Sequence, residues 1–90
     1  MMKILCVCGL GQGTSLILRM NVEQALGEKN IIADVEHIDL SSATSMSADY
    51  IITSNELAES LEDHPAKVII VNNYFDMDEI NAAIETNIPV

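Results

Sequence analysis

The residues best suited to chemistry lie near the amino terminus, in one glycine-rich stretch. It holds both cysteines and three of the four glycines, and it reads Cys6-Val7-Cys8-Gly9-Leu10-Gly11-Gln12-Gly13-Thr14-Ser15. Glycines concentrated in one loop let backbone amides come close to a ligand. A thiol at the amino end of a helix ionises more readily, and the thiolate is the nucleophile. We therefore predict that Cys8 carries, or attacks, a phosphoryl group.

The flanking residues predict that a strand and a helix position this loop. The run 3–8 barely alternates and has the length of a strand buried on both faces. The run 14–29 has apolar residues at helical spacing, which predicts a helix with one buried side. A helix that begins here directs unpaired N–H groups and the positive end of its dipole toward the loop, and both favour an anion.

Three more strands are predicted downstream, over residues 33–38, 50–53 and 67–71. The first of these is polar enough to be an edge strand. Apolar strands that alternate with helices indicate an open parallel sheet, and right-handed crossovers place helices on both of its faces. We therefore predict an α/β fold in one domain over residues 1–90: an open four-stranded parallel sheet with helices on both faces and a phosphate-binding loop after strand 1.

Helix-capping patterns mark two further helices. Thr53–Glu56 has the form of a capping box, which predicts a helix that ends near Leu61. A similar pattern at Asp76–Glu79 predicts a helix that ends near Glu85. The stretch 41–47 is rich in serine, and we expect a loop or a weak turn of helix there.

Polar residues follow several of the predicted strands. The Cys8 loop ends the first strand, Thr53-Ser54-Asn55 ends the third, and Asn72-Asn73 follows the fourth. The carboxyl ends of parallel strands lie at one edge of the sheet, where ligands of open α/β folds bind. We therefore expect these segments to surround one site.

Composition and charge exclude several classes of function. The chain has a net charge of −10, from 14 acidic and 4 basic residues, which argues against nucleic acids and anionic membrane surfaces as partners. No apolar run approaches the ~18 residues of a membrane span. Two cysteines are too few for a disulfide framework, so we expect a cytoplasmic protein. The Cys-x-Cys pair has no further ligands nearby in the sequence, and we expect no metal and no cofactor.

Three known phosphate-binding loops do not match the glycine-rich stretch. The dinucleotide fingerprint requires Gly-x-Gly-x-x-Gly, whereas these glycines alternate. The nucleotide P-loop ends in Gly-Lys-Ser/Thr, but here the sequence is Gly13-Thr14-Ser15. A cysteine phosphatase places Arg after five intervening residues, where this chain has Thr14, so the phosphoryl transition state lacks its clamp. These residues favour a phosphoryl carrier over a phosphatase- or arsenate reductase-like enzyme and over a non-catalytic anion-binding module.

The segment 8–15 resembles the phosphocysteine loop of IIB components of the bacterial phosphoenolpyruvate-dependent sugar phosphotransferase system (PTS). The resemblance is to the ascorbate type, with the galactitol and lactose/cellobiose types as relatives. It extends to the segments 20–23, 51–55 and 76–80, and so covers nearly the whole chain. Ascorbate-type members usually have Asn where this chain has Leu10, and often His where it has Glu56.

The resemblance implies a phosphotransferase subunit that works with two partners. Cys8 would accept a phosphoryl group from a histidine of a IIA protein and donate it to an ascorbate-like or galactitol-like sugar held by the IIC membrane permease. The phosphate would be held by backbone N–H groups, with help from the Thr14 and Ser15 hydroxyls. The residues implied in phosphate binding are Gly9, Leu10, Gly11, Gln12, Gly13, Thr14 and Ser15.

Three other side chains, those of Cys6, Arg19 and His37, have both a structural and a functional interpretation. Cys6 is expected to pack in the core, with a raised pKa, whereas the pKa of Cys8 is expected to be lowered in part. Arg19 is expected to pair with Glu23 at i+4, or else to add positive potential near the phosphate. His37 is expected at the surface or behind the site.

Overall fold

The computed structural model describes residues 2–8 and 12–88, without the side chains of residues 12–15. The strands are β1 (Met2–Cys8), β2 (Ala33–Asp39), β3 (Tyr50–Thr53) and β4 (Lys67–Ile70). The helices are α1 (Gln12–Glu28), α2 (Leu40–Ala43), α3 (Asn55–Ala58) and α4 (Met77–Asn87), and a short 3-10 helix, η1 (Glu59–Leu61), continues α3.

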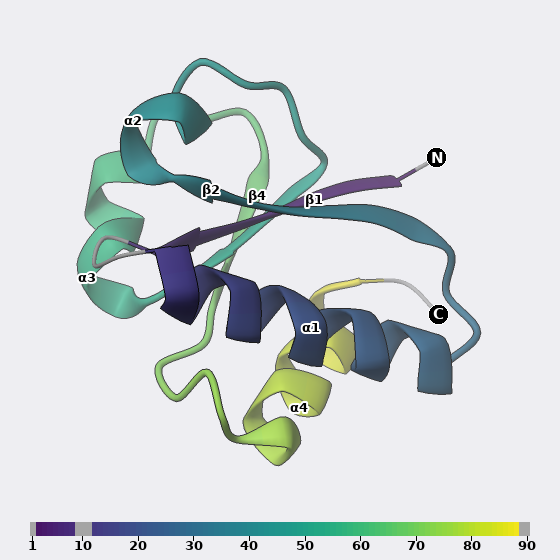
Figure 1. Ribbon diagram of the computed structural model, residues 1–90. Helices are drawn as coiled ribbons and strands as arrows, with labels where there is room; N and C mark the ends of the chain where they lie inside the picture. The colour runs from purple at the N-terminus through teal and green to yellow at the C-terminus, as the bar shows by residue number, and fades with distance from the viewer. Residues whose placement is uncertain (1, 9–11, 89–90) are drawn as a thin grey trace.

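The four strands form one sheet in the order β2-β1-β3-β4, and every neighbouring pair is parallel. Helices α1 and α4 pack on one face of the sheet, while α2, α3 and η1 pack on the other (Figure 1). The predicted α/β fold is therefore confirmed, including β2 at an edge. The predicted phosphate-binding loop falls largely on residues 9–11, which lie outside the described residues.

The central strand β1 contributes side chains to both hydrophobic cores. Its residues 4–7 are fully buried, and they alternate between the two faces of the sheet. Ile4 and Cys6 face the α1–α4 core, whereas Leu5 and Val7 face the α2–α3 core. A strand that must be apolar on both faces appears in the sequence as a continuous apolar run, which explains why β1 could be recognised.

Helix α1 packs against the sheet because its apolar residues recur at helical spacing and so lie on one side of the helix. Leu18, Val22 and Ala25 are fully buried against the sheet. The helix begins at residue 12, two residues before its predicted start. It ends where Asn30 takes a left-handed conformation with φ of 57° and Ile31 N–H donates to Leu26 O at 2.9 Å.

The start of α4 matches its predicted capping pattern in part. The Asp76 carboxylate accepts from the backbone N–H groups of Asp78 and Glu79, as an N-cap should. The Glu79 carboxylate instead accepts from the N–H groups of Asn72 and Asn73, at 2.8 and 3.1 Å. Glu79 thereby attaches the loop after β4 to the first turn of α4.

The capping box predicted at Thr53–Glu56 is wrong. Ser54 is the N-cap of α3, and its side chain makes no capping hydrogen bond. The Thr53 hydroxyl is fully buried and donates to Val7 O at 2.9 Å, so it is not available to cap a helix. The helical segment does end at Leu61, as predicted, after a change from α3 to η1.

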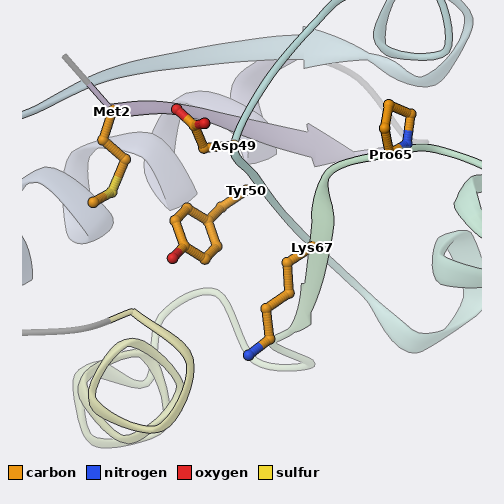
Figure 2. A pocket seen from close by; sticks show the side chains of 5 residues that line it. All are labelled: Met2, Asp49, Tyr50, Pro65 and Lys67. Carbon is orange, nitrogen blue, oxygen red and sulfur yellow. The ribbon is translucent and has the colours of Figure 1, made fainter.

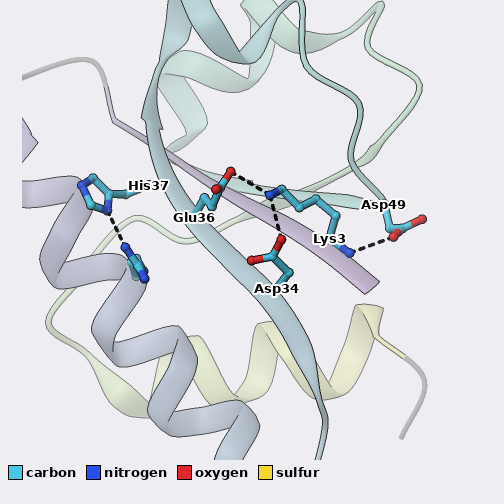
Figure 3. A network of polar contacts seen from close by, with 6 residues as sticks. Lys3, Asp34, Glu36, His37 and Asp49 are labelled. Carbon is cyan, nitrogen blue, oxygen red and sulfur yellow. Dashed lines mark hydrogen bonds and ion pairs between the residues drawn. The ribbon is translucent and has the colours of Figure 1, made fainter. Parts of the chain in front are cut away.

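The polarity of β2 has a direct structural cause. The Lys3 ammonium on β1 lies 2.9 Å from the Asp34 carboxylate and 2.7 Å from that of Glu36, both on β2 (Figure 3). The backbone N–H of Lys3 also donates to Asp49 at 2.8 Å. After β2, the serine-rich stretch contains the short helix α2, whose N-cap is Asp39.

The buried hydroxyl of Thr53 provides a test of the contact between β3 and β1. Replacing Thr53 with Val keeps the shape of the side chain but removes its donor, which should cost about 1–2 kcal/mol of unfolding free energy. Urea unfolding measures this change. Thr44→Val is the matched control, because Thr44 makes the same kind of bond to Ser41 O at an exposed position. Equal losses in the two variants would contradict the importance of the buried bond.

Candidate functional site

Cys8 is the last residue of β1 and lies at the carboxyl edge of the sheet. Its side chain is 6% exposed and belongs to the core beneath α1 and α4. Helix α1 begins four residues later, so its first turn and its unpaired N–H groups follow closely after Cys8. Cys8 therefore combines a nucleophilic atom with an adjacent helix amino end, the combination expected from the sequence.

Tyr74 lies in the loop after β4, an edge loop that the sequence placed near Cys8, but sequence analysis predicted no individual role for this tyrosine. The Cys8 thiol and Ser54 both affect the pKa of its hydroxyl, and that hydroxyl in turn affects the pKa of Cys8. Its ring packs against the core cluster that includes Cys8. One signal was present in the sequence: Tyr74 is one of only two tyrosines and follows a strand at the edge where ligands bind.

The loop that carries Tyr74 is held by contacts with two other segments. The Asn21 side-chain amide on α1 donates to Tyr74 O at 2.8 Å. The Asn55 N–H at the start of α3 donates to the Asn72 side-chain oxygen at 3.2 Å. The polar segments after β3 and β4 therefore meet at one edge of the sheet, as predicted.

Burial controls the ionisation of Cys8. Loss of solvent raises the pKa of the Cys8 thiol, and the Tyr74 hydroxyl opposes that rise. The prediction of a lowered pKa is therefore wrong for the described structure, because the cost of burying a thiolate exceeds the help of its hydroxyl partner. Burial and the neighbouring Cys8 thiol raise the pKa of Tyr74 to about 12, so its hydroxyl keeps its proton at neutral pH.

The other candidate side chains have structural partners. Cys6 is fully buried in the core, and burial raises the pKa of its thiol, as predicted. The Arg19 Nε lies 3.5 Å from the Glu23 carboxylate, which confirms the expected i+4 pair. A second Arg19 nitrogen lies 3.4 Å from His37 Nδ1 on β2 (Figure 3). The guanidinium therefore has an ion-pair partner on α1 and a neighbour on β2, while its buried Nε has no hydrogen-bond partner among the described residues.

The predicted phosphate-binding set lies only partly within the described residues. Gly9, Leu10 and Gly11 lie outside the described residues. Gln12, Gly13, Thr14 and Ser15 form the first turn of α1, and only their backbone is described. Among the described residues, no group of three or more His, Cys, Asp or Glu side chains could hold a metal ion. None of the described helices has the length and apolar character needed to cross a membrane.

A hollow of about 470 Å³ lies at the opposite edge of the sheet, away from Cys8. It is formed at the amino ends of three strands and the loops that precede them, by Met2, Asp49, Tyr50, Pro65 and Lys67 (Figure 2). Ligands of open parallel sheets bind at the carboxyl edge instead. The candidate site is therefore the edge at Cys8.

Comparison with known proteins identifies the family. The family model described as "PTS system, Lactose/Cellobiose specific IIB subunit" matches residues 3–86. The chain belongs to this PTS IIB family. It is therefore a phosphotransferase subunit that acts in sugar uptake, in a system that also has IIA and IIC partners.

Individual relatives support the same assignment. The "Ascorbate-specific PTS system EIIB component" of Mycoplasma pneumoniae is 34% identical over 86 residues, which cover 92% of this chain and 90% of that protein. The Shigella sonnei protein of the same name is 43% identical over 58 residues, or 62% of this chain and 57% of its own length. A lactose-specific IIB domain from Streptococcus pneumoniae superposes with a TM-score of 0.67, over 94% of this chain and 92% of that one. At 15% identity, that likeness shows the fold of a IIB domain.

Removing the Tyr74 hydroxyl should make the Cys8 thiolate harder to form. In Tyr74→Phe, loss of the hydroxyl removes an effect that lowers the Cys8 pKa, so a smaller fraction of the thiol is ionised near neutral pH. Alkylation of Cys8 by iodoacetamide at pH 7 should slow by about threefold or more, and its pH profile should move to higher pH. Site-resolved mass spectrometry measures both effects.

Tyr50→Phe is the control for this measurement, because Tyr50 lies at the opposite edge of the sheet. It should leave the pH profile of Cys8 alkylation unchanged. A Tyr74→Phe profile that matches the wild-type one would exclude Tyr74 from the ionisation of Cys8.

Proposed function

We propose that Cys8 is the residue of this IIB subunit that carries the phosphoryl group. It accepts the group from a phosphohistidine of the IIA protein and passes it to a sugar held by the IIC permease. The observation that supports this best is the position of the thiol, at the carboxyl end of β1 directly ahead of the first turn of α1. Cys6, the other thiol, is fully enclosed between the sheet and α1.

Each transfer exchanges one bond to phosphorus for another. In the first, the Cys8 sulfur forms an S–P bond as the N–P bond of the phosphohistidine breaks, and the released histidine nitrogen can take up the thiol proton. In the second, a sugar hydroxyl oxygen forms an O–P bond as the S–P bond breaks, and the proton lost by the hydroxyl returns Cys8 to its thiol form. The backbone N–H groups of residues 9–15 are proposed to hold the phosphoryl oxygens between the two steps.

Tyr74 has a positioning role in this proposal. Its hydroxyl is protonated at neutral pH and acts to lower the pKa of Cys8, so it stabilises negative charge on the Cys8 sulfur. Because burial keeps the resting thiol mainly protonated, the thiolate forms most readily once a partner supplies a base. The donor histidine is well suited to this, since its nitrogen becomes basic as the N–P bond breaks.

A carrier role also explains the lack of an arginine clamp. A phosphatase needs strong transition-state stabilisation so that water can attack its phosphocysteine. Position 14, where a cysteine phosphatase has Arg, is Thr in this chain. Arg19 is engaged with Glu23 and His37. A phosphocysteine with this environment should persist until an acceptor arrives.

The proposed sugar is ascorbate-like, and the proposed location is the cytoplasm. The Mycoplasma pneumoniae relative, which matches nearly the whole chain, carries an ascorbate-specific name. The alternative is a galactitol-like sugar, because Leu10 and Glu56 depart from the residues usual in the ascorbate type. Uptake assays with labelled ascorbate and galactitol, in cells that depend on this subunit, distinguish the two.

The two cysteines should respond oppositely to the same substitution. Cys8→Ser should abolish acceptance of phosphate from phosphoenolpyruvate through the general PTS proteins and IIA, because a serine hydroxyl is scarcely ionised at neutral pH. Cys6→Ser should still accept phosphate, while the buried hydroxyl costs about 1–3 kcal/mol of stability. Mass spectrometry maps the phosphate, and urea unfolding measures stability. Phosphate on Cys6, or an active Cys8→Ser variant, would refute the proposal.

The same environment predicts that the protein is a poor hydrolase. Turnover of aryl phosphates by the wild type should be no faster than that of Cys8→Ser, because the loop lacks an arginine clamp. Release of nitrophenol, followed spectroscopically over several hours, measures it. Rapid turnover that depends on Cys8 would support a cysteine phosphatase in place of a carrier.

A further inference from the structure

A groove of about 480 Å³ runs between β4 and the α3–η1 segment, and we call it the β4 groove. Its floor includes the apolar side chains of Leu61, Val68 and Ile70, and its rim carries the carboxylates of Glu59 and Glu62. The other lining residues are Asn55, Ala58, His64 and Ala66.

The apolar floor of the β4 groove is incompletely covered. β4 is the outermost strand of the sheet, and no described strand pairs with its outer side. Ile70 is 43% exposed, whereas Ile69, the preceding residue of the same strand, is buried. An aliphatic side chain left open on an edge strand is a favourable contact for another chain.

The residues around the β4 groove that are charged at neutral pH are acidic. Residues 54–66 include four acidic residues and no Lys or Arg. Lys67, the cation of β4, extends to the other face of the sheet beside Tyr50 and toward α4 (Figure 2). The groove therefore combines an apolar floor with a rim that attracts Lys and Arg side chains.

The β4 groove also lies close to the candidate site. In the sheet register, Ile70 is level with Thr53, and Thr53 is level with Val7, the residue before Cys8. Neighbouring strands are about 4.8 Å apart, so Ile70 lies roughly 10 Å from Val7 across the sheet. A chain bound in the groove would therefore lie beside the edge at which Cys8 transfers its phosphoryl group.

Building on the proposed function, we propose that the β4 groove docks a segment of the IIC permease that bears apolar side chains flanked by Lys or Arg. Cytoplasmic loops of membrane proteins are enriched in Lys and Arg close to the membrane. The cytoplasmic leaflet itself is anionic and repels a chain with a net charge of −10. The permease, and not the lipid, therefore supplies the attraction that brings Cys8 to the sugar.

Binding to the permease in nanodiscs tests this docking. The probe is the IIC permease of the same transport system, reconstituted in zwitterionic lipid, with empty zwitterionic and empty anionic nanodiscs as further arms. Ile70→Ser removes part of the groove floor, and Glu59→Lys/Glu62→Lys reverses its rim. The matched controls are Ile32→Ser, at a side chain that is 79% exposed, and Glu28→Lys/Glu85→Lys, which changes the net charge equally on α1 and α4. Circular dichroism verifies that each variant is folded.

We expect both groove variants to bind the permease about tenfold more weakly, and the controls to stay within about twofold of wild type. The loss in the charge-reversal variant should shrink at high salt. Neither type of empty nanodisc should bind the wild type. The proposal would be overturned if both groove variants bound the permease as tightly as the wild type. It would also be overturned if the groove and control variants lost affinity for the permease equally. Binding to empty anionic nanodiscs would overturn it too.

Phosphorylation by IIA separates this proposal from the function on which it rests. All groove and control variants should accept phosphate on Cys8 from IIA at the wild-type rate. A wild-type protein that takes no phosphate on Cys8 would refute the carrier function itself. If IIA phosphorylates the groove variants slowly but the control variants at the wild-type rate, the groove binds IIA. That outcome would refute docking of the permease there. Sedimentation could instead show that the wild type self-associates and that the groove variants do not. That result would identify a second copy of this chain as the occupant of the groove.

Discussion

The rest of the structure depends on the burial of β1 on both of its faces. Residues 4–7 are fully enclosed, with α1 and α4 on one side and α2 and η1 on the other. A register shift of one residue would exchange the side chains of the two cores, so packing fixes the position of the strand. Cys8 is the next residue along. Its place at the edge of the sheet is therefore determined by the four apolar residues before it.

Most features that the sequence predicted are determined by nearby residues, whereas the meeting of the segments after β3 and β4 followed from the general rule for parallel sheets. The apolar run of β1 and the capping pattern at Asp76 each involve residues within a few positions of one another. The features that it missed depend on partners far along the chain. Thr53 bonds to Val7, 46 residues away, and Asn21 bonds to the loop at Tyr74, 53 residues away. Such contacts exist only once the sheet has formed, and a local pattern cannot reveal them.

The loop after β4 connects the candidate site to three helices. Asn21 contacts it from α1, Asn55 from the start of α3, and Glu79 from the first turn of α4. Because Tyr74 lies in this loop, the environment of the Cys8 sulfur depends on packing throughout the domain. These contacts help to explain why the Cys8 thiol is enclosed.

The enclosure of Cys8 also affects how long the thiol survives in a cell. Peroxides oxidise the thiolate far faster than the neutral thiol, through sulfenic acid to irreversible products. Burial raises the Cys8 pKa and leaves 6% of the residue exposed, so the resting protein offers oxidants little thiolate and little access. The same burial that raises the pKa of Cys8 therefore also protects its sulfur from oxidative damage.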